Sequence, residues 1–150
     1  MKLSTKGRYG LRALIDLALY SENETVSIQS IARRQNISDS YLEQLMRKLR
    51  SAGLIVSVRG AQGGYKLARP AYEISVGDVL RALEGSLEAV TCGGEDNSCQ
   101  GADLCVTKFV WERINSSIRD TVDSIKLSQL VEESRLMREK GQIQVQKCDN

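Results

Sequence analysis

Three of the four cysteines in this 150-residue chain lie close together in a segment of glycines and small polar residues. They are Cys92, Cys99 and Cys105, spaced C-x6-C-x5-C. No hydrophobic period runs through the segment, so packing against a core does not explain why the thiols cluster there. Thiolates are the soft ligands that select zinc or iron–sulfur clusters, and glycine lets a backbone fold closely around a bound group. The spacing therefore favours a metal-binding loop.

Two other interpretations of this loop stay open on the residues alone. A closely spaced, odd set of cysteines can form a redox pair with a spare thiol, and structural zinc sites also use thiolates. Zinc sites usually show closer cysteine pairs and four nitrogen or sulfur ligands, whereas the chain contains no histidine. An iron–sulfur cluster also needs four ligands, mostly cysteines, and the loop supplies three. Of the three interpretations, an iron–sulfur cluster is favoured, although the loop does not supply its fourth ligand.

The composition is that of a soluble, cytosolic protein that is not an enzyme. There is no apolar run of the roughly 18 residues needed to cross a membrane, and no signal-peptide pattern at the N-terminus. Cytosolic thiols are normally reduced, which favours metal binding over a disulfide framework. Catalysis is not expected, because the chain has no histidine for acid–base chemistry and no nucleophile beside an evident base.

Charge is divided unevenly along the chain. Residues 1–70 hold 12 Lys and Arg against 5 Asp and Glu, a net charge of +7, and residues 71–150 hold 9 against 14, a net charge of −5. A basic half of this kind is typical of a surface that faces nucleic acid. A solvated basic surface without a partner would have the same composition.

The basic half contains the pattern of a helix-turn-helix. A short helix is predicted for residues 27–35 and a longer one for residues 39–52, joined by the turn Asn36-Ile37-Ser38. The second helix has a polar face and the dimensions of a major groove. Candidate DNA contacts on this helix and at its start are Ser38, Ser40, Tyr41, Glu43, Gln44, Arg47 and Lys48.

A glycine-rich hairpin is predicted directly after the second helix. Residues 54–58 and 65–67 have the composition of two short strands, and a hairpin in this position is a wing. Arg59 lies at its tip, where it could enter a narrow minor groove or lie in solvent. Lys6 and Arg8 lie in the first turns of a helix predicted for residues 5–20. Cations there oppose the helix dipole, so we expect them to contact phosphates.

A long helix is predicted after the cysteine loop. Val106, Val110, Ile114, Ile118 and Val122 recur every four residues and form one apolar stripe. A single helix projecting from a small domain cannot bury such a stripe, so a partner helix is the expected cover. Packing against its own winged domain is the alternative.

These elements predict a mainly α fold with a small β-wing and four segments. Residues 1–86 form a winged helix-turn-helix domain, and residues 87–105 form the cysteine-rich loop. Residues 106–137 hold the dimerisation helix and a following short helix. Residues 138–150 are expected to be a flexible tail.

Several motifs together carry a family resemblance. They are Met1 to Tyr9, Ser38 to Leu45, Ser57 to Gly60, Gly63 to Tyr65 and the cysteine loop. In these the chain resembles the IscR-type iron–sulfur cluster regulators, which are winged helix-turn-helix transcription factors. The resemblance implies a homodimer on palindromic double-stranded DNA, with a [2Fe–2S] cluster on Cys92, Cys99 and Cys105. It further implies control of cluster-biogenesis genes, with promoter choice set by cluster occupancy. Nitric-oxide-sensing [4Fe–4S] repressors of the same family, or a thiol- or zinc-based redox regulator, are the alternatives.

The chain departs from the family pattern around the fourth ligand. The first cysteine gap is one residue longer than in IscR-type loops, and Lys108 occupies the position of their histidine ligand. An ammonium with a pKa of about 10.4 has no free lone pair at neutral pH. Arg8 stands where the nitric-oxide-sensing relatives have an acidic ligand. The open candidates are Cys148, Asp103, Glu95, Asp96 and an exogenous thiol.

Overall fold

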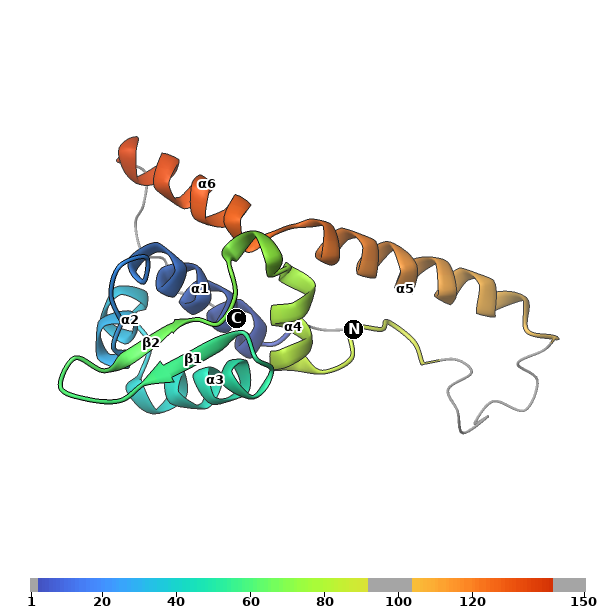
Figure 1. The fold of residues 1–150 in the computed structure, drawn as a ribbon. Helices are drawn as coiled ribbons and strands as arrows, with labels where there is room; N and C mark the ends of the chain where they lie inside the picture. The colour runs from blue at the N-terminus through green and yellow to red at the C-terminus, as the bar shows by residue number, and fades with distance from the viewer. Residues whose placement is uncertain (1–2, 92–103, 142–150) are drawn as a thin grey trace.

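The computed structural model describes residues 3–91 and 104–141, which form a mainly helical chain with a small antiparallel sheet (Figure 1). This confirms the predicted fold class. In chain order the elements are α1 (Thr5–Tyr20), α2 (Ile28–Gln35), α3 (Asp39–Ser51), β1 (Ile55–Val58), β2 (Gly64–Leu67), the 3-10 helix η1 (Ala71–Glu73), α4 (Val76–Glu84), α5 (Val106–Ser124) and α6 (Leu127–Glu139).

Short polar side chains define where the helices of the winged domain begin and end. The Ser38 hydroxyl accepts from the Tyr41 amide at the start of α3, at 3.2 Å, as predicted. Ser75 and Asp78 form a reciprocal capping box at the start of α4. Asn36 ends α2 in the left-handed region, with φ 53°, a conformation that asparagine tolerates well. These local signals produce the tight turn between α2 and α3.

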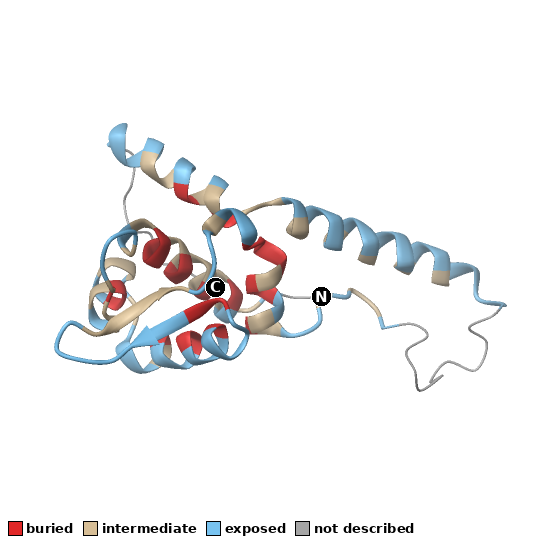
Figure 2. Cartoon of the chain, viewed as in Figure 1, coloured by how far each residue is buried: buried red, intermediate tan, exposed pale blue. Residues whose placement is uncertain are grey.

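The core lies between α1, α3 and α4, where their apolar faces meet (Figure 2). Its fully buried side chains include Leu14, Leu17, Ile31, Leu42, Leu45, Met46, Leu49 and Leu83. Helix α1 approaches α4 closely at Gly10, where an added Cβ would lie 2.2 Å from a Leu83 methyl. With one face of α3 buried in this core, its opposite face is left for solvent or a ligand.

Strands β1 and β2 form the wing directly after α3. Their antiparallel register pairs Ile55 with Leu67 and Val58 with Gly64. The segment before α2 adds one further bridge, because Val26 and Tyr65 exchange backbone hydrogen bonds of 3.0 and 2.8 Å. The wing is thus attached to the helical core on its β2 side.

Helix α5 leaves the winged domain as a long arm, and α6 turns back across α1 (Figure 1). Two backbone hydrogen bonds join the α5–α6 junction to the start of α4: Val76 donates to Ile125 at 2.9 Å, and Leu127 donates to Ile74 at 2.8 Å. Helix α6 continues to Glu139, past the predicted boundary at residue 137. Among the described residues, no helix has both the length and the apolarity to cross a bilayer.

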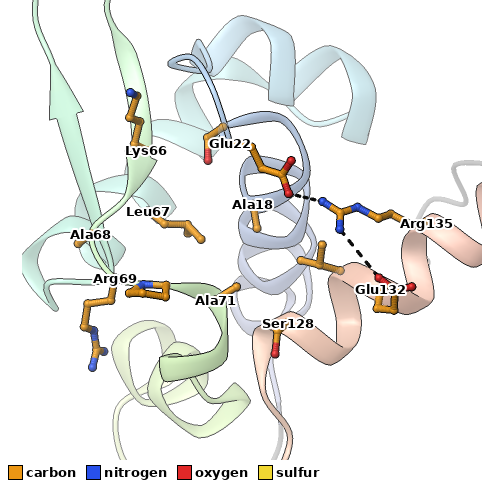
Figure 3. Close-up of a pocket in the computed structure, with 13 residues that line it drawn as sticks. Ala18, Glu22, Lys66, Leu67, Ala68, Arg69, Ala71, Ser128, Glu132 and Arg135 are labelled. Carbon is orange, nitrogen blue, oxygen red and sulfur yellow. Dashed lines mark hydrogen bonds and ion pairs between the residues drawn. The ribbon is translucent and has the colours of Figure 1, made fainter.

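Helix α6 is held against the winged domain by apolar contacts and ion pairs. Leu127 and Val131 are buried, and Arg135 bridges Glu22, which follows α1, and Glu132 of α6 (Figure 3). These contacts line a hollow between α1, the segment after β2, and α6.

Candidate nucleic-acid interface and cysteine loop

One face of α3 presents a continuous set of exposed polar side chains. Ser40, Glu43, Gln44 and Arg47 are all exposed and follow the spacing that places residues on one side of a helix. Amide, hydroxyl, carboxylate and guanidinium groups together can address every kind of base edge in a major groove. These four predicted contacts are therefore brought together on the surface opposite the core.

Tyr41 and Lys48 point instead toward neighbouring helices. The Tyr41 hydroxyl donates to the Thr5 hydroxyl at 3.2 Å, and the Tyr41 ring lies edge-on against Tyr9 with centroids 6.1 Å apart. The Lys48 ammonium donates to the Leu83 carbonyl at 3.3 Å, close to the end of α4, where a cation is favoured. Both side chains hold α3 in place, and their contact with DNA stays a prediction.

The basic start of α1 is balanced by a carboxylate from α4. Glu84 accepts hydrogen bonds from the Ser4 amide at 2.9 Å, the Ser4 hydroxyl at 2.7 Å and the Gly7 amide at 2.9 Å. Partial burial raises the pKa of Glu84, but these bonds and the charge of Lys6 outweigh it and hold that pKa below its usual value. The helix start thereby tolerates the exposed Lys6 and the half-buried Arg8.

A buried ion pair sets the position of α2 against α1. Asp16 is 1% exposed, and it accepts from the Arg34 guanidinium at 2.7 Å and from the Gln35 amide at 2.9 Å. The hydrogen bond to Asp16 raises the pKa of Arg34. The sequence signal for this contact was Asp16, an acidic residue within the apolar stretch of α1. Hydrophobic periodicity alone did not identify it as a buried ion-pair partner.

Arg59 lies at the exposed tip of the wing, as predicted. It immediately precedes Gly60, whose φ of 122° is a conformation that L side chains rarely adopt. The tip turn is closed by a hydrogen bond of 3.0 Å from the Gly63 amide to the Gly60 carbonyl. The geometry leaves the Arg59 side chain clear of the core.

The described part of the cysteine loop ends in one reactive thiol. Cys105 is exposed immediately before α5, with its sulfur 3.1 Å from the Thr107 hydroxyl. That hydrogen bond, helped by the Lys108 and Thr107 amides, lowers the pKa of the Cys105 thiol. A thiol that ionises readily suits a thiolate-bound metal. Lys108, which occupies the position of the family's histidine ligand, pairs with Glu112 along α5 at 3.8 Å.

The other predicted cluster ligands lie outside the described residues. These are Cys92 and Cys99, with the fourth-ligand candidates Cys148, Asp103, Glu95 and Asp96. Within residues 3–91 and 104–141, no group of three or more cysteine or acidic side chains has the geometry of a metal site. Of the predicted cysteine ligands, Cys105 lies within the described residues, and its binding of a metal or cluster stays a prediction.

Asn115 of α5 holds the segment that leads into the cysteine loop. Its side-chain oxygen accepts from the Ala89 amide at 2.8 Å, and its side-chain nitrogen donates to the Val90 carbonyl at 2.9 Å. Both ends of the loop are therefore attached to α5, through Asn115 at one end and Cys105 at the other. Sequence reasoning missed Asn115, because nothing local to α5 marks a partner 25 residues away.

The apolar stripe of α5 is largely exposed over its first half. Val106 is 86% exposed, Phe109 66%, Val110 46% and Ile114 38%. Ile118 and Val122 are half-buried nearer the winged domain. Residues of the stripe line a shallow groove along the helix: Phe109, Val110, Arg113, Ile114, Ser117 and Ile118. Among the described residues, the winged domain does not cover the far half of this stripe.

The chain is similar to known transcription regulators over most of its length. Residues 3–133 match the family model Rrf2, described as "Iron-dependent Transcriptional regulator". The HTH-type transcriptional regulator IscR of Vibrio vulnificus is 44% identical over 137 residues, which cover 91% of this chain and 81% of that protein.

Two solved structures agree with this match. T. potens IscR has a TM-score of 0.72 and 45% identity, covering 96% of this chain and 93% of that one. CymR (YrzC), the global cysteine regulator of B. subtilis, has a TM-score of 0.73 and 41% identity, covering 89% and 98%. The matched relatives are helix-turn-helix regulators of transcription, in line with the predicted absence of an enzymatic role. This chain belongs to the Rrf2 family of transcriptional regulators, in which it is similar to IscR.

Proposed function

We propose that this regulator is a cytoplasmic homodimer that binds palindromic promoter DNA, and that an iron–sulfur cluster on Cys92, Cys99 and Cys105 changes which promoters it binds. The supporting observation is the arrangement on α5. This helix holds both ends of the cysteine loop, through Asn115 and Cys105, and it carries the exposed apolar stripe. The similarity to IscR supports cluster-biogenesis genes as the targets.

The cluster is proposed as [2Fe–2S], with [4Fe–4S] as the alternative if nitric oxide is the signal. Three thiolates supply three of the four ligands that such clusters use. Bound, the cluster would supply a redox-sensitive, sulfur-held centre beside the start of α5. The Cys105 thiol is suited to this role because it is exposed and its pKa is lowered. Lys108 is a poor substitute for a histidine ligand, because an ammonium has no free lone pair, and the candidates for the fourth ligand are Cys148, Asp103, Glu95, Asp96 and an exogenous thiol.

DNA is contacted by α3 in the major groove and by the wing in the adjacent minor groove. Gln44 and Ser40 address base edges, while Arg47, Lys6 and Arg8 neutralise phosphates. A two-fold dimer places its two recognition helices about 34–36 Å apart, one helical turn of DNA. Dimerisation is proposed through Val106, Val110, Ile114, Ile118 and Val122, because a second copy of the helix would cover the exposed stripe.

Protein purified without oxygen tests the cofactor. We expect a coloured protein that contains iron and acid-labile sulfide, with absorption and electron-paramagnetic-resonance spectra that distinguish the two cluster types. Cys92→Ala should lose both elements, and Cys148→Ala, made in parallel, tests Cys148 as the fourth ligand: loss of both elements in it would identify Cys148 as a ligand. Colourless protein whose promoter preference does not change after chemical reconstitution would exclude the cluster. Zinc in place of iron would indicate a structural metal module.

A thiol-based regulator is the second candidate. It is favoured by the lowered pKa of the Cys105 thiol and by the similarity to CymR, the global cysteine regulator of B. subtilis. Hydrogen peroxide would be reduced to water as two thiols of the loop form a disulfide. Intact mass before and after peroxide treatment of metal-free protein detects this loss of two hydrogens. DNA binding that changes with the disulfide, and not with reconstitution, would favour this candidate.

A further inference from the structure

The turn between α1 and α2 contacts the wing at two successive levels. Val26 and Tyr65 exchange backbone hydrogen bonds beside β2. One residue earlier in the chain, and closer to the wing tip, the Thr25 hydroxyl donates to the Gln62 carbonyl at 2.5 Å. The segment before α2 therefore reaches past β2 to the tip turn itself. The hydroxyl contact is made by the side chain, so it depends on which residue stands at position 25.

The two glycines that follow Gln62 fit tight spaces: Gly64 permits the close approach of the segment before α2, and Gly63 permits the tight turn of the tip itself. A Cβ at Gly64 would lie 2.6 Å from the Val26 carbonyl oxygen, and a Cβ at Gly63 would lie 2.5 Å from the Val58 carbonyl oxygen. Both distances are too short for a real side chain and both involve backbone, which cannot easily move. The tip is thus packed tightly where it meets the strands. Between Val58 and Gly63, the hydrogen bonds that hold the tip within the described part of the chain are its closing bond and the one at Gln62.

We propose that Thr25 is a positioning residue for DNA binding, and that its hydroxyl fixes the wing tip so that Arg59 is presented to the minor groove beside α3. Arg59 lies in the same tip turn, three residues before Gln62. A glycine-rich tip without this contact would lose conformational entropy on binding, because it would have to be ordered by the DNA. The Thr25 hydroxyl, which is attached to the helical core, orders the tip before DNA binds. This inference rests on the wing contact in the proposed function.

The test uses Thr25→Val, which keeps the branched side chain and replaces the hydroxyl with a methyl group, and Thr25→Ser, which keeps the hydroxyl. The probe is a duplex selected from a randomised library by the wild-type protein, and binding is measured by fluorescence anisotropy. Since one hydrogen bond contributes a net factor of roughly three to ten in an equilibrium constant, Thr25→Val should weaken binding by about that factor. Thr25→Ser should bind like the wild type, and all three proteins should have similar thermal midpoints.

Combined variants separate positioning from a general effect on the fold. In an Arg59→Ala background, Thr25→Val should cause no further loss, because the side chain that it positions is absent. In a Gln44→Ala background the loss should persist, since Gln44 belongs to α3 and not to the wing. An equal loss in both backgrounds would overturn the inference, as would wild-type binding by Thr25→Val. If Arg59→Ala itself binds normally, the wing contact in the proposed function is wrong, and the role of Thr25 falls with it.

Discussion

At the scale of single residues, the carboxylate of Glu84 links α4 to the start of α1 through several hydrogen bonds. It belongs to α4, yet it receives the first free amides of α1, a place where a helix favours negative charge. Lys6 and Arg8 lie in the same turn and are proposed phosphate contacts. The charge of Glu84 therefore stabilises the helix start that presents these two cations.

The first prediction concerns Glu84→Gln. The folded-state pKa of Glu84 lies below its usual value of 4.5, so its charge stabilises the fold above that pH, and the contribution is lost as pH falls through the lowered value. Glu84→Gln should reduce the free energy of unfolding by about 1 kcal/mol near neutral pH. The deficit should shrink in acid, as measured by denaturant unfolding between pH 7 and pH 3. Glu133→Gln, an exposed change on α6, is the control and should show no such trend.

The second prediction concerns Glu43→Ala. An exposed anion on the face of α3 is repelled by DNA, so we expect Glu43 either to accept from a cytosine amino group or to reject wrong sites. The variant should bind more sequences, and the order of affinities in a promoter panel should change. Removal of a charge would also make binding less dependent on sequence at one position. An unchanged order of affinities would rule out Glu43 as the selector.

At the scale of elements, α5 connects the cysteine loop to the winged domain. Its far end follows Cys105, its middle holds residues 89–90 through Asn115, and its near end meets α4. There Arg81 pairs with Asp123, and Gly77 allows the contact, because an added Cβ would lie 1.9 Å from an Asp123 carboxylate oxygen. A change in the loop can therefore reach the winged domain along α5, as well as through the segment that follows α4.

The third prediction concerns Asn115→Ala. Without the two side-chain hydrogen bonds, the segment before the loop is no longer held, and its amides should exchange hydrogen faster. Hydrogen exchange measured by mass spectrometry should show this at residues 86–91, with a loss of stability of about 1 kcal/mol. Ser116→Ala, at the neighbouring exposed position, is the matched control. Equal exchange in both variants would mean that the contact does not restrain the segment.

Local rules predicted much of the fold and part of the interface. The Ser38 cap, the left-handed Asn36 and the buried stripe of α3 all depend on residues within one or two turns, and all were confirmed. Because the polar residues of α3 are fixed once its buried face is known, the cluster of Ser40, Glu43, Gln44 and Arg47 followed directly.

The contacts that sequence reasoning missed join residues far apart in the chain. Glu84 reaches Ser4 across 80 residues, Thr25 reaches Gln62 across 37 and Lys48 reaches Leu83 across 35. Periodicity identifies which face of a helix is buried but not which helix lies against it, so it cannot find such pairs. For the same reason, Tyr41 and Lys48 were predicted as DNA contacts from their polarity, and their hydrogen bonds to Thr5 and Leu83 could not be predicted.

At the scale of the whole molecule, the arm formed by α5 projects with its apolar stripe uncovered over the far half. Exposed apolar area of this extent on one face marks an interaction surface. A second copy is the proposed cover, because two such helices would bury each other's stripes and bring two winged domains to one side of a duplex.

The fourth prediction concerns Ile114→Glu. A charge in the centre of the stripe should separate the dimer, because burying an unpaired carboxylate costs several kcal/mol. Analytical ultracentrifugation should show a monomer, and affinity for a palindromic duplex should fall by more than tenfold while binding to a half-site is retained. Ser116→Glu places the same charge on an exposed, polar part of α5 and should leave the dimer intact. A dimeric Ile114→Glu protein would place the dimer contact elsewhere.

The backbone bonds between Ile74, Val76, Ile125 and Leu127 make a stiff joint at the base of the arm. An α-helix of 19 residues is about 28 Å long at its standard rise. A tilt of about five degrees at this joint corresponds to a movement of about 2.5 Å at the far tip. Cys105 lies at that tip, so a shift of this size at the proposed cluster would change the angle between the arm and its winged domain by only a few degrees.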